Sequence, residues 1–143
     1  MLRAAYLQHD KSPLLLDSTQ EVQRYLTSTN GFLWVSLESS DNSEIETVLR
    51  DVFHFHPLAI EDCQSPGFQV AKIDDFSQYI FIITHALNLQ SEDEDQITRE
   101  LDLFLGNNFV VTCYSDKQMP AIAKTWSQIQ KDERIARFGP DFL

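Results

Sequence analysis

The residues of this sequence best suited to chemistry are carboxylates. Glu61 and Asp62 lie together at the end of a short predicted helix, and Asp74-Asp75 precedes a predicted strand. A run of four acids, Glu92–Asp95, lies between two predicted strands. Carboxylate oxygens are preferred ligands of hard dications such as Mg²⁺, so each group is a candidate cation site. Since no EF-hand spacing or glycine turn organises them, the pattern alone favours solvent-exposed surface for all three.

The histidines give a second set of candidates. His54 and His56 alternate and could offer two imidazoles to Zn²⁺, but no third ligand is near them in sequence, which favours packing or capping. His85 lies on an apolar strand face and is predicted to be a partly buried core residue. The sequence has no glycine-rich phosphate loop, nucleophile elbow or His-Glu-x-x-His helix, so it predicts no enzyme.

Composition narrows the class of partner. The 143 residues include 22 Asp and Glu against 11 Lys and Arg, a net charge of −11. This balance argues against nucleic acid and against an anionic membrane surface, both of which attract basic proteins. Apolar residues make up 43% of the chain, which predicts a folded domain. Cys63 and Cys113 are far apart in sequence and predict two buried thiols in a reduced, cytosolic protein.

The elements that must position these residues can be read from capping and periodicity. Capping-box patterns at Ser18–Glu21 and Asp41–Glu44 predict two helices, and His56-Pro57 predicts the start of a third. The remaining segments with strand or helix patterns are Leu2–Leu7 and Phe32–Leu37 (strands), Lys72–Leu89 (containing a long central strand), Thr98–Leu105 and Phe109–Tyr114 (a hairpin), and Met119 toward Arg137 (a helix). Together they predict an α/β fold, a single domain over residues 1–143 with helices packed on a mixed sheet.

The sequence His56-Pro57-Leu58-Ala59-Ile60-Glu61-Asp62 resembles the CorA family of divalent-cation channels and transporters. The resemblance is to the N-terminal cytoplasmic domain, and it spans roughly Tyr6 to the end of the chain. Other segments that carry it are the strand Trp34–Leu37, Lys72, the aromatic-rich Tyr79–Ile83, the strand-turn-strand Leu103–Thr112, and Gly139–Leu143, which looks like the opening of the family's long stalk helix.

The resemblance implies an α/β/α sandwich with a mixed parallel and antiparallel sheet. It implies a homopentamer in the full-length protein, at the cytoplasmic face of the cell's inner membrane, with membrane contact only through a C-terminal region beyond this chain. By motif position, Glu61 and Asp62 would form a regulatory Mg²⁺ site, with Co²⁺ or Zn²⁺ as alternatives, completed by a neighbouring subunit. We therefore expect this domain by itself to be soluble, a monomer or dimer, and without a tightly bound ion.

This sequence departs from the family pattern near that site. Where the family commonly has Gln-Arg-Pro-Lys, this chain has Gln69-Val70-Ala71-Lys72. Two alternatives stay open, namely a domain of a Zn²⁺ transporter of the same superfamily and a free-standing acidic metal-binding or interaction module.

Overall fold

The computed structural model describes residues 1–38, 41–65, 67, 69–87, 98–115, 119–132, 134 and 139. Among these residues are seven strands: β1 (Leu2–Leu7), β2 (Leu14–Leu16), β3 (Phe32–Glu38), β4 (Lys72–Asp75), β5 (Tyr79–Leu87), β6 (Thr98–Gly106) and β7 (Phe109–Tyr114). They form one sheet in the order β2-β1-β3-β7-β6-β5-β4. The β3–β7 pair is parallel and the other pairs are antiparallel, which confirms the predicted mixed sheet.

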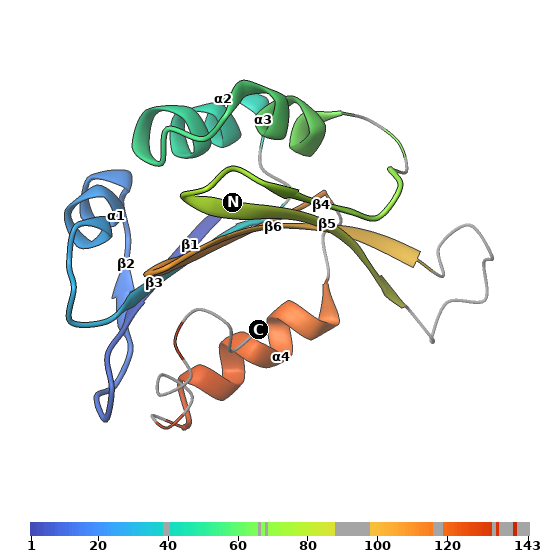
Figure 1. Ribbon diagram of the computed structural model, residues 1–143. Helices are drawn as coiled ribbons and strands as arrows, with labels where there is room; N and C mark the ends of the chain where they lie inside the picture. The colour runs from blue at the N-terminus through green and yellow to red at the C-terminus, as the bar shows by residue number, and fades with distance from the viewer. Residues whose placement is uncertain are drawn as a thin grey trace.

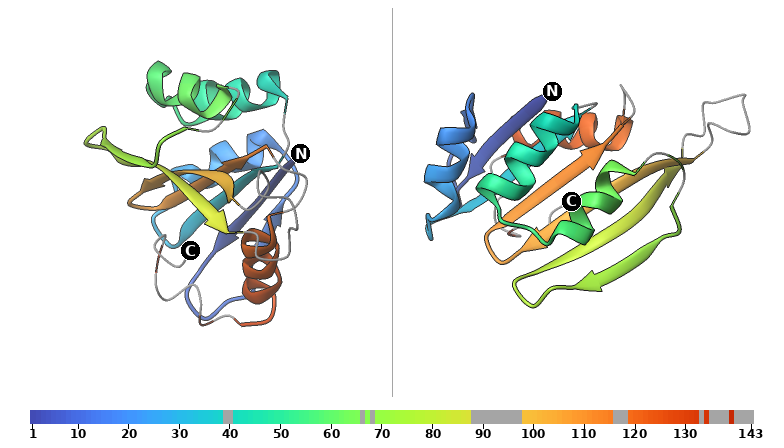
Figure 2. Two further views of the ribbon diagram at one scale, coloured as in Figure 1. Left: turned by 90° about the vertical axis from the view of Figure 1, so that its right-hand side faces the viewer. Right: turned by 90° about the horizontal axis from the view of Figure 1, so that it is seen from above.

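The helices lie in two layers on opposite faces of this sheet (Figure 1). One layer holds α1 (Thr19–Leu26), α2 (Asn42–Glu46), the π-helical segment η1 (Thr47–Val52) and α3 (Pro57–Gln64). The other face carries α4 (Pro120–Ile129). Seen from above, α2, η1 and α3 lie over the sheet, with α1 toward its β2–β1 edge (Figure 2). The α/β/α sandwich expected from the sequence is therefore confirmed.

The larger apolar core lies between the first helical layer and the sheet. It includes side chains from α1, α2, η1 and α3 packed on inward-facing strand residues, among them Val22, Ile45, Val48, Leu49, Ile60, Phe81 and Phe104. Within it, Phe55 stacks on Phe104 with ring centroids 4.4 Å apart. Burial of this kind is the main favourable term in folding, so this core fixes the position of α3 over the sheet.

The second core lies under α4 and centres on two tryptophans. Trp126 of α4 stacks on Trp34 of β3, with ring centroids 4.3 Å apart and ring planes 15° from parallel. The Trp34 indole nitrogen donates to the Thr112 hydroxyl at 3.3 Å. On the same face of the sheet, Ile80 of β5 and Ile73 of β4 are 38% and 71% exposed. Within the described residues, α4 therefore leaves the β4–β5 part of this face uncovered.

The prediction for Lys72–Leu89 is correct in part. A long strand is present as β5, but β4 precedes it as a hairpin partner that the sequence reading did not separate. The chain reverses at Phe76–Gln78, where Ser77 has a φ of 67°. The strand is also not central, because it is second from the β4 edge, and the exposed Ile80 shows that its apolar second face is not fully buried.

The predicted helix starts are confirmed by their caps. The Ser18 and Asp41 side chains accept from the backbone N–H of Glu21 and Glu44, at 3.3 Å and 2.8 Å. The amphipathic run after Asp41 is helical, but its second half is a π-helix, in which Phe53 N–H donates to Val48 O at 3.1 Å. The last helix ends at Ile129 rather than continuing toward Arg137.

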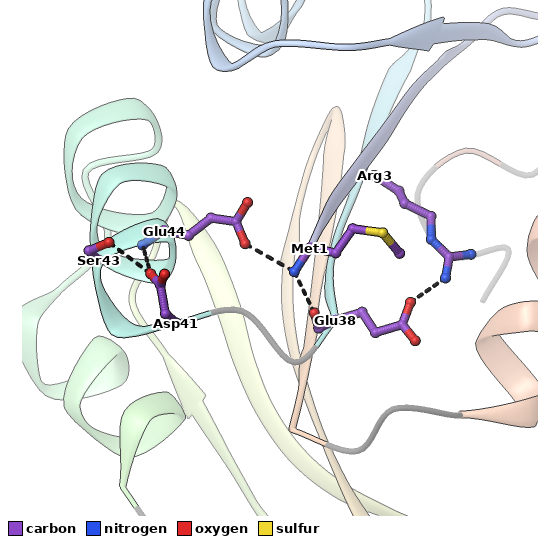
Figure 3. Close-up of polar contacts among 6 residues, drawn as sticks. All are labelled: Met1, Arg3, Glu38, Asp41, Ser43 and Glu44. Carbon is purple, nitrogen blue, oxygen red and sulfur yellow. Dashed lines mark hydrogen bonds and ion pairs between the residues drawn. The ribbon is translucent and has the colours of Figure 1, made fainter.

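The first residues tie β1 to the start of α2 (Figure 3). The Met1 ammonium donates to the Glu38 backbone carbonyl at 2.6 Å and lies 3.0 Å from a Glu44 carboxylate oxygen. The Arg3 guanidinium pairs with the Glu38 side chain. The acidic run Glu92–Asp95 and the segment Pro140–Leu143 lie outside the described residues.

Candidate functional site: an acidic groove beside α3

The position of Glu61 and Asp62 follows from how α3 begins and packs. Pro57 occupies the first turn of α3, where a missing N–H costs nothing, and the His56 ring nitrogen accepts from Leu58 N–H at 3.2 Å. Ala59 and Ile60 are buried against the sheet. Glu61 and Asp62 follow Ile60 by one and two positions, so the turn of the helix carries their side chains away from the buried side. Glu61 is exposed, and Asp62 is partly buried at the edge of the layer.

Asp62 is paired with a lysine from the neighbouring edge strand. The Lys72 ammonium lies 2.7 Å from Asp62 Oδ2 and 2.9 Å from Asp74 Oδ2. The hydrogen bonds to Asp62 and then Asp74 raise the pKa of Lys72, which is charged at neutral pH. Gln69 also reaches α3, donating from Nε2 to the Asp62 backbone carbonyl at 2.5 Å. The link from α3 to β4 is therefore polar and centred on one ammonium group.

The structure brings together two acidic pairs that the sequence analysis considered separately. Glu61, Asp62, Asp74 and Asp75 line one groove of about 520 Å³, together with Leu58, Lys72 and Phe76. We call this site the acidic groove. The lining holds four carboxylates and one lysine, which pairs with Asp62 and Asp74, so the groove has an excess of negative charge. The signal that sequence reasoning missed is the hairpin: once β4 is separate from β5, Lys72 and Asp74 lie on one side of a strand beside α3.

The groove is not a ready-made metal cage. Within the part of the chain that the structure describes, no three His, Cys, Asp or Glu side chains converge to hold an ion. Carboxylates arranged this loosely suit a dication that keeps part of its water shell, as Mg²⁺ does. Metal binding by Glu61 and Asp62 therefore stays a prediction.

The histidine candidates have structural roles. His56 caps α3 and stacks on Phe76, with ring centroids 5.1 Å apart. The His54 ring nitrogen lies 2.9 Å from the Arg50 backbone oxygen, and the residue has a φ of 56°. Packing and capping, rather than a zinc site, thus account for this pair. His85 is partly buried, as predicted, with Nε2 3.8 Å from Glu100 Oε2.

A second polar pocket, of about 190 Å³, lies on the other side of α3. Its lining includes Cys63, Glu100, Asp102 and Cys113. Asp102 is 4% exposed, and its burial, followed by the nearby Glu100 charge, raises the pKa of its carboxyl to about 7. Contact with Cys113, followed by burial, raises the pKa of the Cys63 thiol. Of the two thiols predicted to be buried, Cys113 is buried and Cys63 is only partly buried, and nothing in the sequence indicates that the two lie together.

Comparison with known proteins agrees with this architecture. Residues 29–140 match the family described as "CorA-like Mg2+ transporter protein". The chain is 39% identical over 110 residues to the Bacillus subtilis (strain 168) protein named "Putative metal ion transporter YfjQ". That alignment covers 77% of this chain and 32% of the relative, so the chain spans about a third of the curated relative's length.

Solved structures share the fold at low sequence identity. Full-length CmaX has a TM-score of 0.74 and 14% identity, covering 92% of this chain and 39% of that one. The complete CorA magnesium transporter of Methanocaldococcus jannaschii gives 0.63 and 16%, covering 90% of this chain and 36% of that one. The soluble domain of the same CorA gives 0.62 and 17%, covering 92% and 48%.

The family description, the Bacillus subtilis relative and the complete Methanocaldococcus jannaschii structure each name a transporter. No helix in the described residues is long and apolar enough to cross a membrane. The family match covers well over half of the chain and includes α3, the acidic groove and strands β3 to β7. This chain belongs to the CorA-like Mg²⁺ transporter family.

Proposed function

We propose that this chain is the cytoplasmic, metal-sensing domain of a divalent-cation transporter, and that the acidic groove takes a hydrated dication, Mg²⁺ in the first instance. The observation that carries the proposal is the meeting of Glu61 and Asp62 with Asp74 and Asp75 in one exposed groove. Repulsion among these carboxylates is relieved by a dication, and Mg²⁺ bridges carboxylates through waters that it retains.

The regulatory step is an assembly equilibrium. In the homopentamer proposed for the full-length protein, the groove of one subunit faces carboxylates of its neighbour, so a bound ion favours the arrangement in which the two surfaces are close. An ion that binds one arrangement more tightly shifts the population toward it, and loss of the ion shifts it back. The excess acidic charge of the whole chain, −11, strengthens this dependence because like-charged subunits repel.

The test is Mg²⁺-dependent protection from a protease in the full-length protein, comparing the natural sequence with Glu61→Ala plus Asp62→Ala. We expect the double variant to lose protection at Mg²⁺ concentrations that protect the natural protein. A matched control is Asp17→Ala plus Asp51→Ala, which removes the same charge from two exposed positions outside the acidic groove. Normal protection of the Glu61/Asp62 variant would refute the sensing role.

Ion identity is tested separately by uptake. We propose Mg²⁺ and Co²⁺ as the transported ions, so cells that express the full-length protein should accumulate these ions faster than cells without it. Uptake of Zn²⁺ alone would assign the protein to Zn²⁺ transport. A natural reading frame without membrane-spanning helices would instead support a free-standing metal-binding module.

A further inference from the structure

The two cysteines of the chain lie together although they are fifty positions apart in sequence. Cys63 is on α3 and Cys113 is on β7, and both line the 190 Å³ polar pocket. The Cys63 thiol is close enough to the Cys113 thiol and to the Asp102 carboxyl for both groups to raise its pKa. Both cysteines are free thiols in this structure.

The fold fixes this meeting from two sides. Asp102 and Cys113 are directly paired across the antiparallel β6–β7 ladder, so their side chains leave the sheet on the same face. Cys63 lies three and four positions after the buried Ile60 and Ala59, on the side of α3 that faces the sheet. The thiols are therefore positioned by the packed core and not by a loop.

We infer that Cys63 and Cys113 form a reversible disulfide when the protein meets a small peroxide. A disulfide forms without backbone movement where two cysteines lie close and their Cβ atoms point toward each other, and here a helix and a strand place both cysteines on the wall of one pocket. The inference concerns the chemistry of this pocket and does not depend on the proposed metal-sensing function.

The reaction balances with hydrogen peroxide as the oxidant. The Cys63 thiol gives its proton to the ionised fraction of Asp102, and the thiolate attacks one peroxide oxygen, breaking the O–O bond to leave a sulfenic acid and, once that proton is returned, a first water. Because the pKa of the Cys63 thiol is raised and that of Asp102 is about 7, the thiolate is scarce at neutral pH and the reaction quickens as pH rises. The Cys113 sulfur then attacks the Cys63 sulfur, the S–O bond breaks, and the second water leaves with the Cys113 proton. Two thiols are oxidised by two electrons in total, and one peroxide is reduced to two waters.

The pocket also determines which oxidants reach the pair. Its volume of about 190 Å³ is several times the ~30 Å³ that one water takes up in the liquid, so a peroxide molecule fits. Cys113 is 3% exposed, so a bulky disulfide such as oxidised glutathione does not reach that thiol directly, whereas Cys63 is partly exposed at the pocket edge. Asp102 Oδ1 has no hydrogen-bond partner within the described residues, which leaves an acceptor for the thiol proton at the site.

The experiment treats the folded chain with hydrogen peroxide, quenches it, then unfolds it and alkylates the remaining thiols. We expect the mass to fall by two hydrogen atoms, both alkylation sites to be lost, and digestion to give one cross-linked peptide pair joining Cys63 to Cys113. Dithiothreitol should restore both thiols. The melting temperature should rise by several degrees on oxidation, because the bond closes a long loop of the unfolded chain.

Three results would overturn the inference: two thiols that stay free after peroxide, oxygen added to separate cysteines without a cross-link, or a disulfide only between chains. Cys63→Ser is the matched control, since Cys63 is at the pocket edge; it should show no loss of two hydrogens and no rise in melting temperature. The peptide map of the natural sequence decides the question even if a serine variant fails to fold.

Discussion

Lys72 Nζ lies 2.7 Å from Asp62 Oδ2, so the acidic residue at the family's motif position already has a cation of the chain beside it. The same ammonium lies 2.9 Å from Asp74 Oδ2 and links α3 to β4. A dication that entered the acidic groove would meet Lys72 as a competitor for these two carboxylates. Any metal site here is consequently one in which the lysine moves aside or shares the groove.

The first prediction follows from this competition. Lys72→Met should bind Mg²⁺ more tightly than the natural sequence, because removing one positive charge about 4 Å from a doubly charged ion is worth about 2 kcal/mol in water, or roughly thirtyfold in affinity at low salt. Calorimetric titration measures it, and we expect weak binding by the natural domain. Lys124→Met, the same change on the exposed face of α4, should leave the affinity unchanged. Equal affinities for the two variants would place the ion away from Lys72.

The same variant separates binding from stability. The Lys72 pairs are partly exposed, with the lysine side chain 38% accessible, and exposed ion pairs contribute at most about 1 kcal/mol. Urea unfolding of Lys72→Met should therefore differ from the natural sequence by less than about 1 kcal/mol. A larger loss would mean that the α3–β4 link is structural, and the change in Mg²⁺ affinity would then need a different explanation.

Asp102 gives a prediction about pH. Its pKa is raised from 3.8 to about 7 in the folded protein, so the native state holds a proton that the unfolded state has released. Stability should fall as pH rises from about 4 through 7 and level off above that, by up to about 4 kcal/mol if the shift of about three pH units is taken at full value. Urea unfolding at several pH values measures the slope.

The control for this prediction is Asp102→Asn, which keeps the shape of the side chain but cannot titrate. It should flatten the stability profile between about pH 4 and 7, whereas Asp51→Asn, at an exposed position, should keep the slope of the natural sequence. If Asp102→Asn retained the full slope, the pH dependence would belong to another group.

How far the sequence predicts this fold depends on how local each signal is. Caps such as Ser18 and Asp41 and the helix-opening Pro57 are set by neighbouring residues, and the structure confirms them. The β4–β5 reversal was missed because it turns at Phe76–Gln78, which contains no glycine, proline or asparagine.

The candidate site shows the same limit. Glu61 and Asp62 were identified only through the family resemblance, since two adjacent acids on a helix are ordinary surface residues. Their meeting with Asp74, and the meeting of Cys63 with Cys113, depend on which strand lies beside α3 and on the β6–β7 register. Pairings between distant segments are not visible in local patterns.

The tryptophan stack predicts how α4 is held. Trp126 is 6% exposed and packs on Trp34, so Trp126→Ala should lower the free energy of unfolding by about 3–5 kcal/mol through lost burial and the cavity left behind. Urea unfolding followed by far-UV circular dichroism measures this without relying on tryptophan emission. Ser127→Ala, at the next, exposed position of α4, should change stability little. A small effect of Trp126→Ala would mean that α4 is not held by this stack.

The Asp41 cap predicts a pH effect of the opposite sign. Asp41 Oδ1 accepts from the Glu44 N–H at 2.8 Å and from the Ser43 hydroxyl at 2.7 Å (Figure 3). The hydrogen bond from the Glu44 backbone, followed by the one from Ser43, lowers the pKa of the Asp41 carboxyl below 3.8. The charged cap therefore adds its full stability at pH values above the pKa of the unfolded chain. That stability is lost as pH falls through the lower pKa of the folded protein.

Asp41→Ala should therefore lower the melting temperature by a few degrees at pH 7 and by less near pH 3, because protonation has by then weakened the natural cap. Asp41→Asn separates capping from charge, since an asparagine oxygen accepts the same bonds but does not titrate. The difference between the asparagine and alanine variants should stay nearly constant over the same pH range. A constant difference between the natural sequence and Asp41→Ala would show that the cap does not depend on the carboxylate charge.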